Sequence, residues 1–460
     1  METLQRTANR GSISTGFDID NSIKTQANAG NEWFYRSSPT TGNKRTFTFS
    51  FWIKRTQLDG YQADNYLMSQ GSNARFHFAH HTLRFMFDGG STELEADAKL
   101  RDTSAWYHIV IAVDTTQSTA ANRVKAYLNG QDYDWNNTKY PSQNQEGSWM
   151  SGTNMYFNTR DGDGSYDNSG YWSEVVVIDG QQLAPTDFGE YDDSGIWKPK
   201  DLSDLTFGSE GFYYKFDNAS SLGEDSSGNG NDATLNNITA ADQATDSPTN
   251  NFCTLNPLYN YAYGNTITEG ATKIYGAANN WGGGKATFGL TSGKWYWEIK
   301  QLANGNTFMG LQTDGEDNIS SGNAQSQNTS VVFYTDGTLQ YSNGSESTTS
   351  AANSIAANSI VGFALDLDSA TQTIKVYNNN SLVTAFGSSG TANLSTYNIA
   401  DKTVFPFVAL YDRTVNMNFG GYTVSSISSA ASDENGYGTF EYAPPSGYYA
   451  LCTKNLAEYG

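Results

Sequence analysis

The sequence predicts an all-β protein made of two antiparallel, jelly-roll-like β-sandwiches in tandem. The first observation is composition: 14% of the residues are aromatic and only 16% are charged, against the ~25% charged residues usual in globular proteins. Gly, Asn, Ser and Thr make up the difference, which favours short strands and tight turns over helices. The second observation is that apolar residues recur with a period of two in many short segments. A chain of 460 residues is long enough for two such bodies.

In the first half of the chain the clearest strand is residues 46–54, where phenylalanines alternate with mostly polar residues. The same alternation predicts further strands at residues 76–78, 83–87, 106–114, 123–128 and 171–178. Apolar side chains occupy both faces of 171–178, so we place this strand in the middle of a sheet. Asn129–Gly130 tolerates positive φ and predicts a tight hairpin turn. Residues 184–191, with Pro185 near their start, are expected to form a short helix.

The second half shows the same period in a second series of segments. Strands are predicted at residues 293–300, 308–311, 331–334, 360–368, 373–378, 404–410 and 415–419. The dipeptide Asp336–Gly337 predicts another hairpin turn.

Residues 225–260 separate the two series. This stretch places Gly228, Gly230, Pro248 and Pro257 among Asn, Asp, Ser and Thr, so it can bury little apolar surface. The predicted organisation is an N-terminal arm or attachment segment with the first strands at 1–45, a first sandwich at 46–224, a linker at 225–260, and a second sandwich with a C-terminal extension at 261–460.

Four segments of the first sandwich carry a resemblance to a known family. They read FTFSFWIKR, DTSAWYHIVIAVDTT, RVKAYLNGQ and WSEVVVIDGQQLAPTDF. Their order and spacing resemble the laminin G-like domain of the concanavalin A-like superfamily, across about residues 40–215. The resemblance implies a two-sheet sandwich, and it implies that a calcium ion can be bound by loops at the rim.

Five segments of the second sandwich carry another resemblance, in family order across about residues 270–420. They read SGKWYWEIK, MGLQ, FYTDGTLQY, SIVGFALDLDSATQTIKVYNNN and VFPFVALYDRTVNMNFG. This order resembles the SPRY (B30.2-like) domain, which implies an interaction module that binds through loops at one end. On this sequence the implied loops are residues 279–284, 313–318 and 411–413, although they match no binding motif of that family.

The flanking segments DSSGNGNDATLNNIT, DSPTNNFCTLNP and PPSGYYALCTKNL resemble parts of structural proteins of tailed bacteriophages that combine these two domain types. The resemblance therefore extends over the predicted linker and the C-terminal tail.

Net charge and cysteine content exclude several functions. The formal net charge is −21, so the basic surface needed for nucleic acid or for an anionic membrane is missing. The N-terminal residues lack an apolar core, so we expect no secretory signal, and no apolar run is long enough to insert into a membrane.

Cys253 and Cys452 cannot make a disulfide framework. They lie near the ends of the second sandwich, and two reduced, buried thiols are favoured over a disulfide.

No catalytic motif is recognised. Glycosidases on concanavalin A-like sandwiches place paired carboxylates on one strand face, commonly as E-x-D-x-x-E, and no predicted strand has that spacing. Glu298 stands alone, and the pair Asp366 and Asp368 is more typical of turn capping. Histidines 77 and 81 share a direction only if their strand is unbroken, which makes a zinc site a weak alternative. His108 is interpreted as a solvent-facing or capped strand residue.

Residues 161–167 are the candidate metal site. Asp161, Asp163 and Asp167 have the D-x-D-x-S beginning of a calcium loop, but Tyr166 and Trp172 occupy positions that an EF-hand reserves for Gly and Glu. A calcium loop of another kind and an unoccupied acidic turn both remain open. No other cofactor is expected.

Exposed aromatic residues are the candidate ligand-binding groups. Trp52, Trp149, Trp281, Tyr156 and Tyr171 fall on outward strand positions or in loops. Such rings either stack on sugars or pack in protein interfaces, and packing within a homo-oligomer is favoured for most of them. The candidate ligand-binding set is Trp52, Trp149, Trp281, Tyr411, Asp412 and Arg413.

Together these observations predict a non-enzymatic virion surface protein of a tailed phage, located on the tail or capsid. It would be a tail appendage or receptor-binding adhesin that recognises a host glycan or surface protein through sandwich loops. The alternatives are a structural decoration protein and, third, a polysaccharide-degrading enzyme. Expected partners are other virion proteins and further copies of the chain; a trimer is compatible with the sequence but not required by it. A long tail fibre cannot be built from this chain alone, because it has no heptad or repetitive shaft.

Overall fold

The computed structural model describes residues 16–27, 31–37, 40–58, 64–259, 264–276, 278–314, 330–335, 339–342, 346–348, 354–384 and 389–460. Within these residues nearly all regular structure is strand, which confirms the predicted all-β class. The α-helix of the described part, α2 (Thr453–Tyr459), lies at the C-terminus. No helix in this part of the chain is long and apolar enough to span a membrane. The chain divides into two compact units, which meet in sequence between Asn250 and Asn251.

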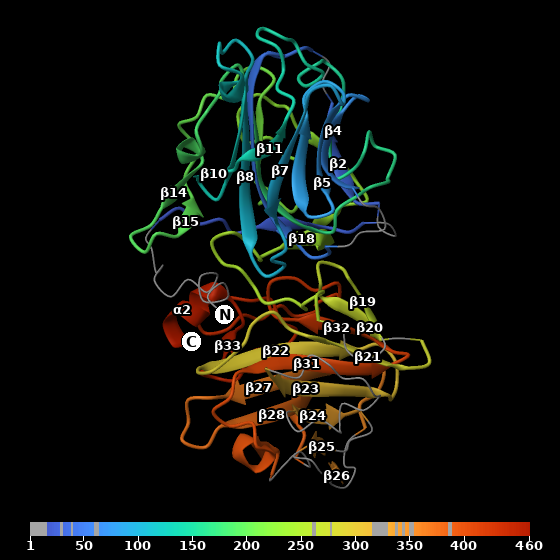
Figure 1. Ribbon diagram of the computed structural model, residues 1–460. Coiled ribbons are helices and arrows are strands. Elements are labelled where there is room, and N and C mark those ends of the chain that lie inside the picture. Colours follow the sequence, from blue (N-terminus) through green and yellow to red (C-terminus); the bar gives the residue numbers. More distant parts are fainter. Residues whose placement is uncertain are drawn as a thin grey trace. The chain divides into compact units, whose positions relative to one another are not determined.

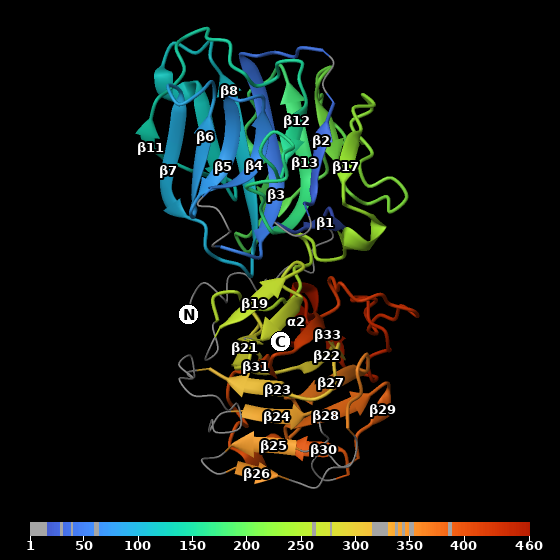
Figure 2. The ribbon, with the colours of Figure 1, turned by 90° about the vertical axis from the view of Figure 1, so that its right-hand side faces the viewer.

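The first unit is a sandwich of two antiparallel sheets (Figure 1). In the described residues its first sheet has eight strands: β10 (Gln131–Asp132), β9 (Val124–Leu128), β8 (Trp106–Asp114), β3 (Thr46–Arg55), β13 (Gly170–Asp179), β1 (Ser22–Thr25) and β18 (Gln243–Ala244) in that order, with β16 (Phe212–Tyr214) also paired to β13. The strands of the second sheet lie side by side in Figure 2, in the order β11 (Trp135–Thr138), β7 (Glu93–Lys99), β6 (Thr82–Met86), β5 (Ala74–Ala79), β4 (Asp64–Gln70), β12 (Met155–Phe157), β2 (Trp33–Arg36) and β17 (Ala233–Asn236).

The alternating phenylalanines of β3 build the core between these sheets. Phe49 and Phe51 are buried, and they meet aromatic rings from the facing layer: Phe49 lies 5.0 Å from Trp149 and Phe51 lies 5.9 Å from Phe76, centroid to centroid. Trp149 also stacks on Phe85 at 5.8 Å. Each such pair adds about 0.5–1.5 kcal/mol to the stability that its buried area gives. The period-two pattern therefore marks the inner face of the sandwich correctly.

The outer face of the first sheet is also covered. Val110, Val176 and Ile178 pack against Phe188 and Phe207, which follow β13 in sequence. This second apolar layer explains why both faces of β13 are apolar, and β13 is central, as predicted, with β3 on one side and β1 and β16 on the other.

The prediction of a short helix at residues 184–191 is wrong. A 3-10 turn, η2 (Pro185–Asp187), is followed at once by β14 (Gly189–Tyr191), which forms a small hairpin with β15 (Trp197–Pro199). The Asp187 carboxylate accepts a hydrogen bond from the Ala184 backbone N–H at 2.8 Å, and this bond closes the single turn.

The stretch 225–260, expected to be a linker, contains strands of the first unit up to residue 250. β17 pairs with β2, and β18 pairs with β1. The Asp225 carboxylate accepts hydrogen bonds from the backbone of Tyr213, Ser227 and Asn231 at 2.9 Å each, so the Gly- and Asn-rich run is a fixed turn rather than a flexible connection. At the other end, β1 and β2 place residues 22–25 and 33–36 of the expected arm in the two sheets. Residues 1–15 lie outside the described part of the chain.

The second unit is also a two-sheet sandwich, in which the predicted strands recur. Its larger sheet has nine strands in the described residues: β19 (Asn265–Thr268), β20 (Lys273–Gly276), β32 (Thr414–Asn418), β22 (Lys294–Gln301), β27 (Ile360–Asp366), β28 (Thr373–Asn378) and β29 (Ser381–Leu382), with β30 (Thr391–Asn393) on β28 and β33 (Tyr449–Ala450) parallel to β22. The other sheet has six, which Figure 2 shows in succession: β21 (Trp281–Lys285), β31 (Val404–Tyr411), β23 (Thr307–Thr313), β24 (Ser330–Tyr334), β25 (Leu339–Ser342) and β26 (Glu346–Thr348). The turn predicted at Asp336–Gly337 lies outside the described residues.

The C-terminal extension covers the outer face of the larger sheet. Tyr296 of β22 packs against Phe440 and Tyr448 there, with ring centroids of Tyr296 and Phe440 5.2 Å apart. Cys253 and Cys452 are both buried and are not joined in a disulfide. The Cys253 backbone N–H donates to the Leu451 carbonyl at 2.9 Å, so the two ends of the unit meet there.

Candidate ligand-binding site

Four of the six predicted ligand-binding residues gather at one end of the six-stranded sheet. β21 begins with Trp281 where β31 ends with Tyr411, and the antiparallel register places these two residues opposite each other. Their rings lie edge to face, 5.7 Å apart between centroids, and both are only partly buried. Asp412 and Arg413 follow directly in the turn after β31.

The row of rings continues onto neighbouring strands. Phe308 of β23 lies 4.9 Å from Trp281, and Tyr334 of β24 lies 4.5 Å from Phe308. The register pairs Phe308 with Ala409 and with Tyr334, so these side chains share one sheet face, and they cluster separately from the core of the unit. We call Trp281, Phe308, Tyr334 and Tyr411 the aromatic row. Phe308 and Tyr334 were not predicted as site residues, although the alternation in β23 and β24 indicates which face they share.

Polar groups border the aromatic row in fixed positions. The Asp412 backbone has φ +51°, a left-handed conformation that Asp tolerates, and its Oδ1 accepts a hydrogen bond from the Tyr275 hydroxyl at 2.6 Å. This bond to a carboxylate raises the pKa of Tyr275. The Asn306 Oδ1 accepts from the Tyr334 hydroxyl at 3.1 Å.

Arg413 is held by main-chain oxygens. It donates to the carbonyls of Asn304 at 3.1 Å and Asp412 at 2.7 Å. These bonds use two of the five N–H donors of a guanidinium, and the others reach no partner among the described residues. The end of the sheet therefore offers a wall of rings with hydrogen-bonding groups beside it, a combination typical of small-ligand sites.

The other two predicted residues are elsewhere and are buried, so their assignment to a binding surface is wrong. Trp149 is 0% exposed in the core of the first unit, where its Nε1 donates to the Met86 carbonyl at 3.0 Å. Trp52 is 4% exposed, beneath the layer that covers the first sheet. Tyr171 is buried as well. Alternation placed Trp52 and Tyr171 outward correctly, but it could not show that a further layer covers that face.

His108, expected to be either solvent-facing or capped, is buried, and both of its ring nitrogens are hydrogen-bonded. Its ring stacks on Trp52 at 4.7 Å, and the Trp197 Nε1 donates to its Nδ1 at 3.0 Å. Nδ1 therefore accepts, the ring proton is on Nε2, and Nε2 donates to the Ser50 Oγ at 2.9 Å. Burial lowers the pKa of His108 to about 3. The Ser–His pair thus has the wrong tautomer for a base that activates a serine.

The predicted metal ligands are not brought together. Among the described residues no three His, Cys, Asp or Glu side chains form a group that could hold a metal ion. The Asp163 Oδ1 accepts from Ser165 N at 2.9 Å and Ser165 Oγ at 2.7 Å, which is a local turn. Asp167 is turned inward and is 5% exposed, and burial raises its pKa to about 7. His77 is buried too, and burial lowers its pKa to about 3.

A second aromatic patch lies on the second sheet of the first unit and was only partly anticipated. Tyr156 of β12, named by the sequence analysis, meets Trp33 at 5.6 Å and Tyr35 at 5.4 Å, both from β2. All three rings are partly buried. Trp33 and Tyr35 were missed because the strand that holds them is only four residues long.

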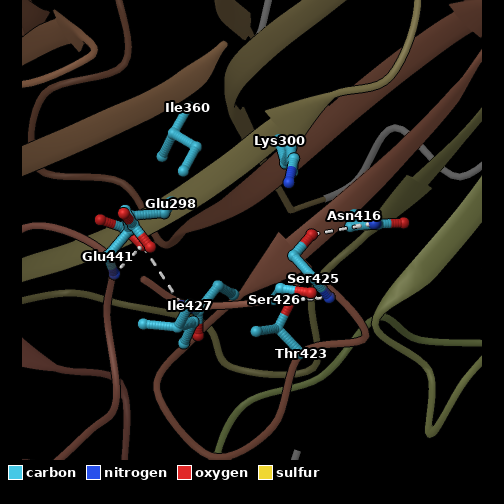
Figure 3. Close-up of a pocket in the computed structure, with 10 residues that line it drawn as sticks. Glu298, Lys300, Ile360, Asn416, Thr423, Ser425, Ser426, Ile427 and Glu441 are labelled. Carbon is cyan, nitrogen blue, oxygen red and sulfur yellow. Dashed lines mark hydrogen bonds between the residues drawn. The ribbon is translucent and has the colours of Figure 1, made fainter. Parts of the chain in front are cut away.

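A small polar hollow lies beside β22, beneath the C-terminal extension (Figure 3). The Glu298 carboxylate there accepts hydrogen bonds from the backbone N–H groups of Glu441 and Tyr442, both at 2.9 Å, from the Asn418 amide at 3.2 Å and from the Tyr296 hydroxyl at 3.1 Å. Burial raises the pKa of Glu298, and the donors oppose that rise. The hollow has room for about one water molecule, so Glu298 anchors the extension rather than a ligand.

Comparison with known proteins gives one family match, which covers part of the chain. Residues 8–178 match a laminin G-like family model described as "Concanavalin A-like lectin/glucanases superfamily". The match begins within the expected arm and includes β1 and β2. No curated protein matches the chain.

Several solved structures are similar. The SPRY domain of human HERC1 is 17% identical with a TM-score of 0.28, covering 35% of this chain and 96% of that one. A candidate carbohydrate-binding protein from Bacteroides ovatus is 18% identical with a TM-score of 0.35, covering 48% of this chain and 60% of that one. A heptameric SAP-like pentraxin from Limulus polyphemus is 16% identical with a TM-score of 0.27, covering 36% of this chain and 80% of that one. By the family model, residues 8–178 of this chain are similar to the concanavalin A-like superfamily.

Proposed function

We propose that this protein is a non-enzymatic virion surface protein of a tailed bacteriophage, and that it binds a host-surface glycan at the aromatic row. The observation that most supports glycan binding is that three partly buried rings of the aromatic row lie near Arg413, Asp412 and Asn306 at one end of the six-stranded sheet. The fourth ring of the row, Phe308, is buried. A sugar ring has an apolar face that can lie on an aromatic ring and hydroxyls at its edge that need polar partners.

Fixed geometry favours binding at this position. The rings belong to adjacent paired strands, and main-chain or neighbouring groups hold the three polar side chains in place. A pre-ordered surface loses little conformational freedom when a ligand binds. This supports recognition of a rigid ligand such as a glycan.

The virion setting rests on the resemblance of residues 225–260 and of the C-terminal tail to tailed-phage structural proteins. The proposed partners are other virion proteins and further copies of the chain. The non-enzymatic character is supported by the side chains that most resemble catalytic groups: His108 has the wrong tautomer, and Glu298 anchors backbone.

Glycan binding is tested by measuring the full chain on a glycan array and then the best ligand by calorimetry. Trp281→Ala and Tyr411→Ala should each weaken binding at least ~10-fold, because central aromatic contacts contribute more than about 1.4 kcal/mol each. The matched control is Tyr191→Ala, which removes an exposed tyrosine of the first unit that is 44% exposed.

Unchanged affinity in both row variants would contradict the proposed site. Loss of affinity in Trp33→Ala instead would move the site to the patch of Trp33, Tyr35 and Tyr156. For the virion setting, labelled antibody against the chain should decorate purified phage particles at the tail or capsid; unlabelled particles would contradict it.

A further inference from the structure

Lys24 is a buried cation held between two carboxylates. It lies on β1, and its Nζ is 2.9 Å from each carboxylate oxygen of Glu32 and 2.9 Å from the Asp242 Oδ1. The three residues are 1%, 8% and 8% exposed. Asp242 is the last residue of η3 (Ala240–Asp242) and immediately precedes β18, which pairs with β1.

The Asp242 carboxyl group is held in a fixed position beside the lysine. Its Oδ2 accepts hydrogen bonds from the Thr239 backbone N–H at 2.8 Å and the Thr239 hydroxyl at 3.2 Å, while Oδ1 faces the lysine. The carboxyl carbon is therefore one C–O bond from an oxygen that already contacts Nζ. Two reacting groups fixed at such a distance have an effective concentration far above any reached in solution.

Amide formation removes two buried charges. One lysine and two carboxylates place three formal charges away from water, and each of them is costly to bury. An amide between Lys24 and Asp242 removes one positive and one negative charge, so the net charge of the site does not change, and Glu32 is left as the third group. In the transition state the charge on Oδ2 would meet the Thr239 N–H and hydroxyl, which are already in place.

We propose that Lys24 and Asp242 form an intramolecular isopeptide bond, with Glu32 as the proton carrier. Glu32 takes a proton from the Nζ ammonium, and the neutral amine attacks the Asp242 carboxyl carbon. A C–N bond forms, and the C–Oδ1 bond breaks. Glu32 transfers two protons, one after the other, from Nζ to Oδ1, and Oδ1 leaves as water. Glu32 itself is unchanged at the end. Ammonium plus carboxylate thus give one amide and one water, with no oxidant or other reactant.

The bond would join β1 covalently to the end of η3, immediately before β18. A cross-link that spans so much of a chain restricts the unfolded state strongly. The unit also contains a second buried pair of the same kind: Lys54 and Asp246, 0% and 1% exposed, with Nζ and Oδ2 2.7 Å apart. In that pair the Asp246 Oδ1 accepts from the Trp106 Nε1 at 3.0 Å. Lys54–Asp246 is the internal comparison for the experiment.

The experiment is intact-mass spectrometry of the purified full chain, followed by proteolysis and tandem mass spectrometry. The expected mass is lower than the sequence mass by one water molecule, and the cross-linked peptide should join Lys24 to Asp242. The full sequence mass, or a cross-link that maps to Lys54 and Asp246, would overturn the proposal.

Variants separate the chemistry from a merely structural role. Asp242→Asn should still form the bond but release ammonia, so its mass deficit changes from one water to one ammonia. Glu32→Gln should reduce the cross-linked fraction at least ~10-fold, whereas Lys54→Arg should keep the wild-type deficit. An Asp242→Asn chain that folds and has its full sequence mass contradicts the mechanism. If a variant does not fold, the wild-type mass and peptide map still decide.

Discussion

At the scale of single residues, burial sets the ionisation of Glu174. It lies on β13 with φ +50°, where the register with β3 shifts between Ser173 and Val176, so a bulge turns its side chain toward Tyr213. Burial raises its pKa to about 8, while the hydrogen bond from the Tyr213 hydroxyl opposes that rise. Glu174 is therefore neutral at pH 7 in the folded protein.

This residue should make the stability of the first unit depend on pH. The folded-state pKa is raised above its ordinary value of 4.5, so the folded state holds the proton more tightly. The stabilisation is fully present below pH 4.5 and is lost as pH rises toward 8, by an amount on the order of 3–5 kcal/mol. Glu174→Gln cannot ionise at this position, so its stability should fall less than that of wild type over this range and should exceed that of wild type at pH 8.5.

The measurement is the free energy of unfolding in urea at pH 5, 7 and 8.5. Asp167 has its pKa raised to about 7 and titrates in the same direction, so only the difference between wild type and Glu174→Gln reports on Glu174. Parallel pH profiles for the two proteins would show that Glu174 is already ionised when folded.

At the scale of elements, the hairpin of β9 and β10 shows what a two-residue turn demands. Asn129 and Gly130 have φ of +48° and +78°, as a type I′ turn requires. A Cβ on Gly130 would lie 2.3 Å from the Trp197 ring, and Trp197 donates the hydrogen bond that fixes the His108 tautomer. This glycine is thus required by the turn and by the packing above it.

Gly130→Ala should destabilise the first unit by about 2–4 kcal/mol, as strain and overpacking combine. The matched control is Gly195→Ala: Gly195 has a similar φ of +76° with nothing within 4 Å of the added Cβ, so it should cost only the ~1–2 kcal/mol of a left-handed backbone. Urea unfolding measures both. An equal loss of unfolding free energy in the two variants would show that the Trp197 ring moves aside for the added Cβ at no energetic cost.

The hairpin and the core strands could be predicted from sequence because their signals are local. Asn129–Gly130 and the alternation in β3 and β8 depend only on neighbours in the chain. The wrong prediction for Trp52 has the opposite origin, because its burial depends on residues far away in the chain. Trp52 stacks on His108, and His108 in turn is hydrogen-bonded to Trp197, 89 positions further along the sequence. Likewise Trp281 and Tyr411 were singled out separately, and only the register of β21 with β31 shows that they form one surface.

At the scale of the whole molecule, each unit holds its own hydrophobic core. The core built from β3, β5, β6 and β13 shares no residue with the core built from β22, β27 and β31. The division falls between Asn250, which bonds back to Ser247, and Asn251, whose backbone N–H donates to the Thr453 Oγ at 3.0 Å. Each side of this peptide bond is therefore satisfied within its own unit, although the polar composition suggested a much longer connection.

Chains of residues 14–250 and 251–460 should consequently fold separately. Each should unfold in one cooperative transition, and the sum of their near-ultraviolet circular dichroism spectra should match that of the intact chain, because aromatic packing is internal to each unit. An unfolded fragment on either side would contradict independent cores. The fragment 14–250 contains Lys24, Glu32 and Asp242, so its mass should also show the loss of one water. Folding of 251–460, which contains neither Lys24 nor Lys54, should proceed without any cross-link, and this separates the stability of the two units from the proposed bond.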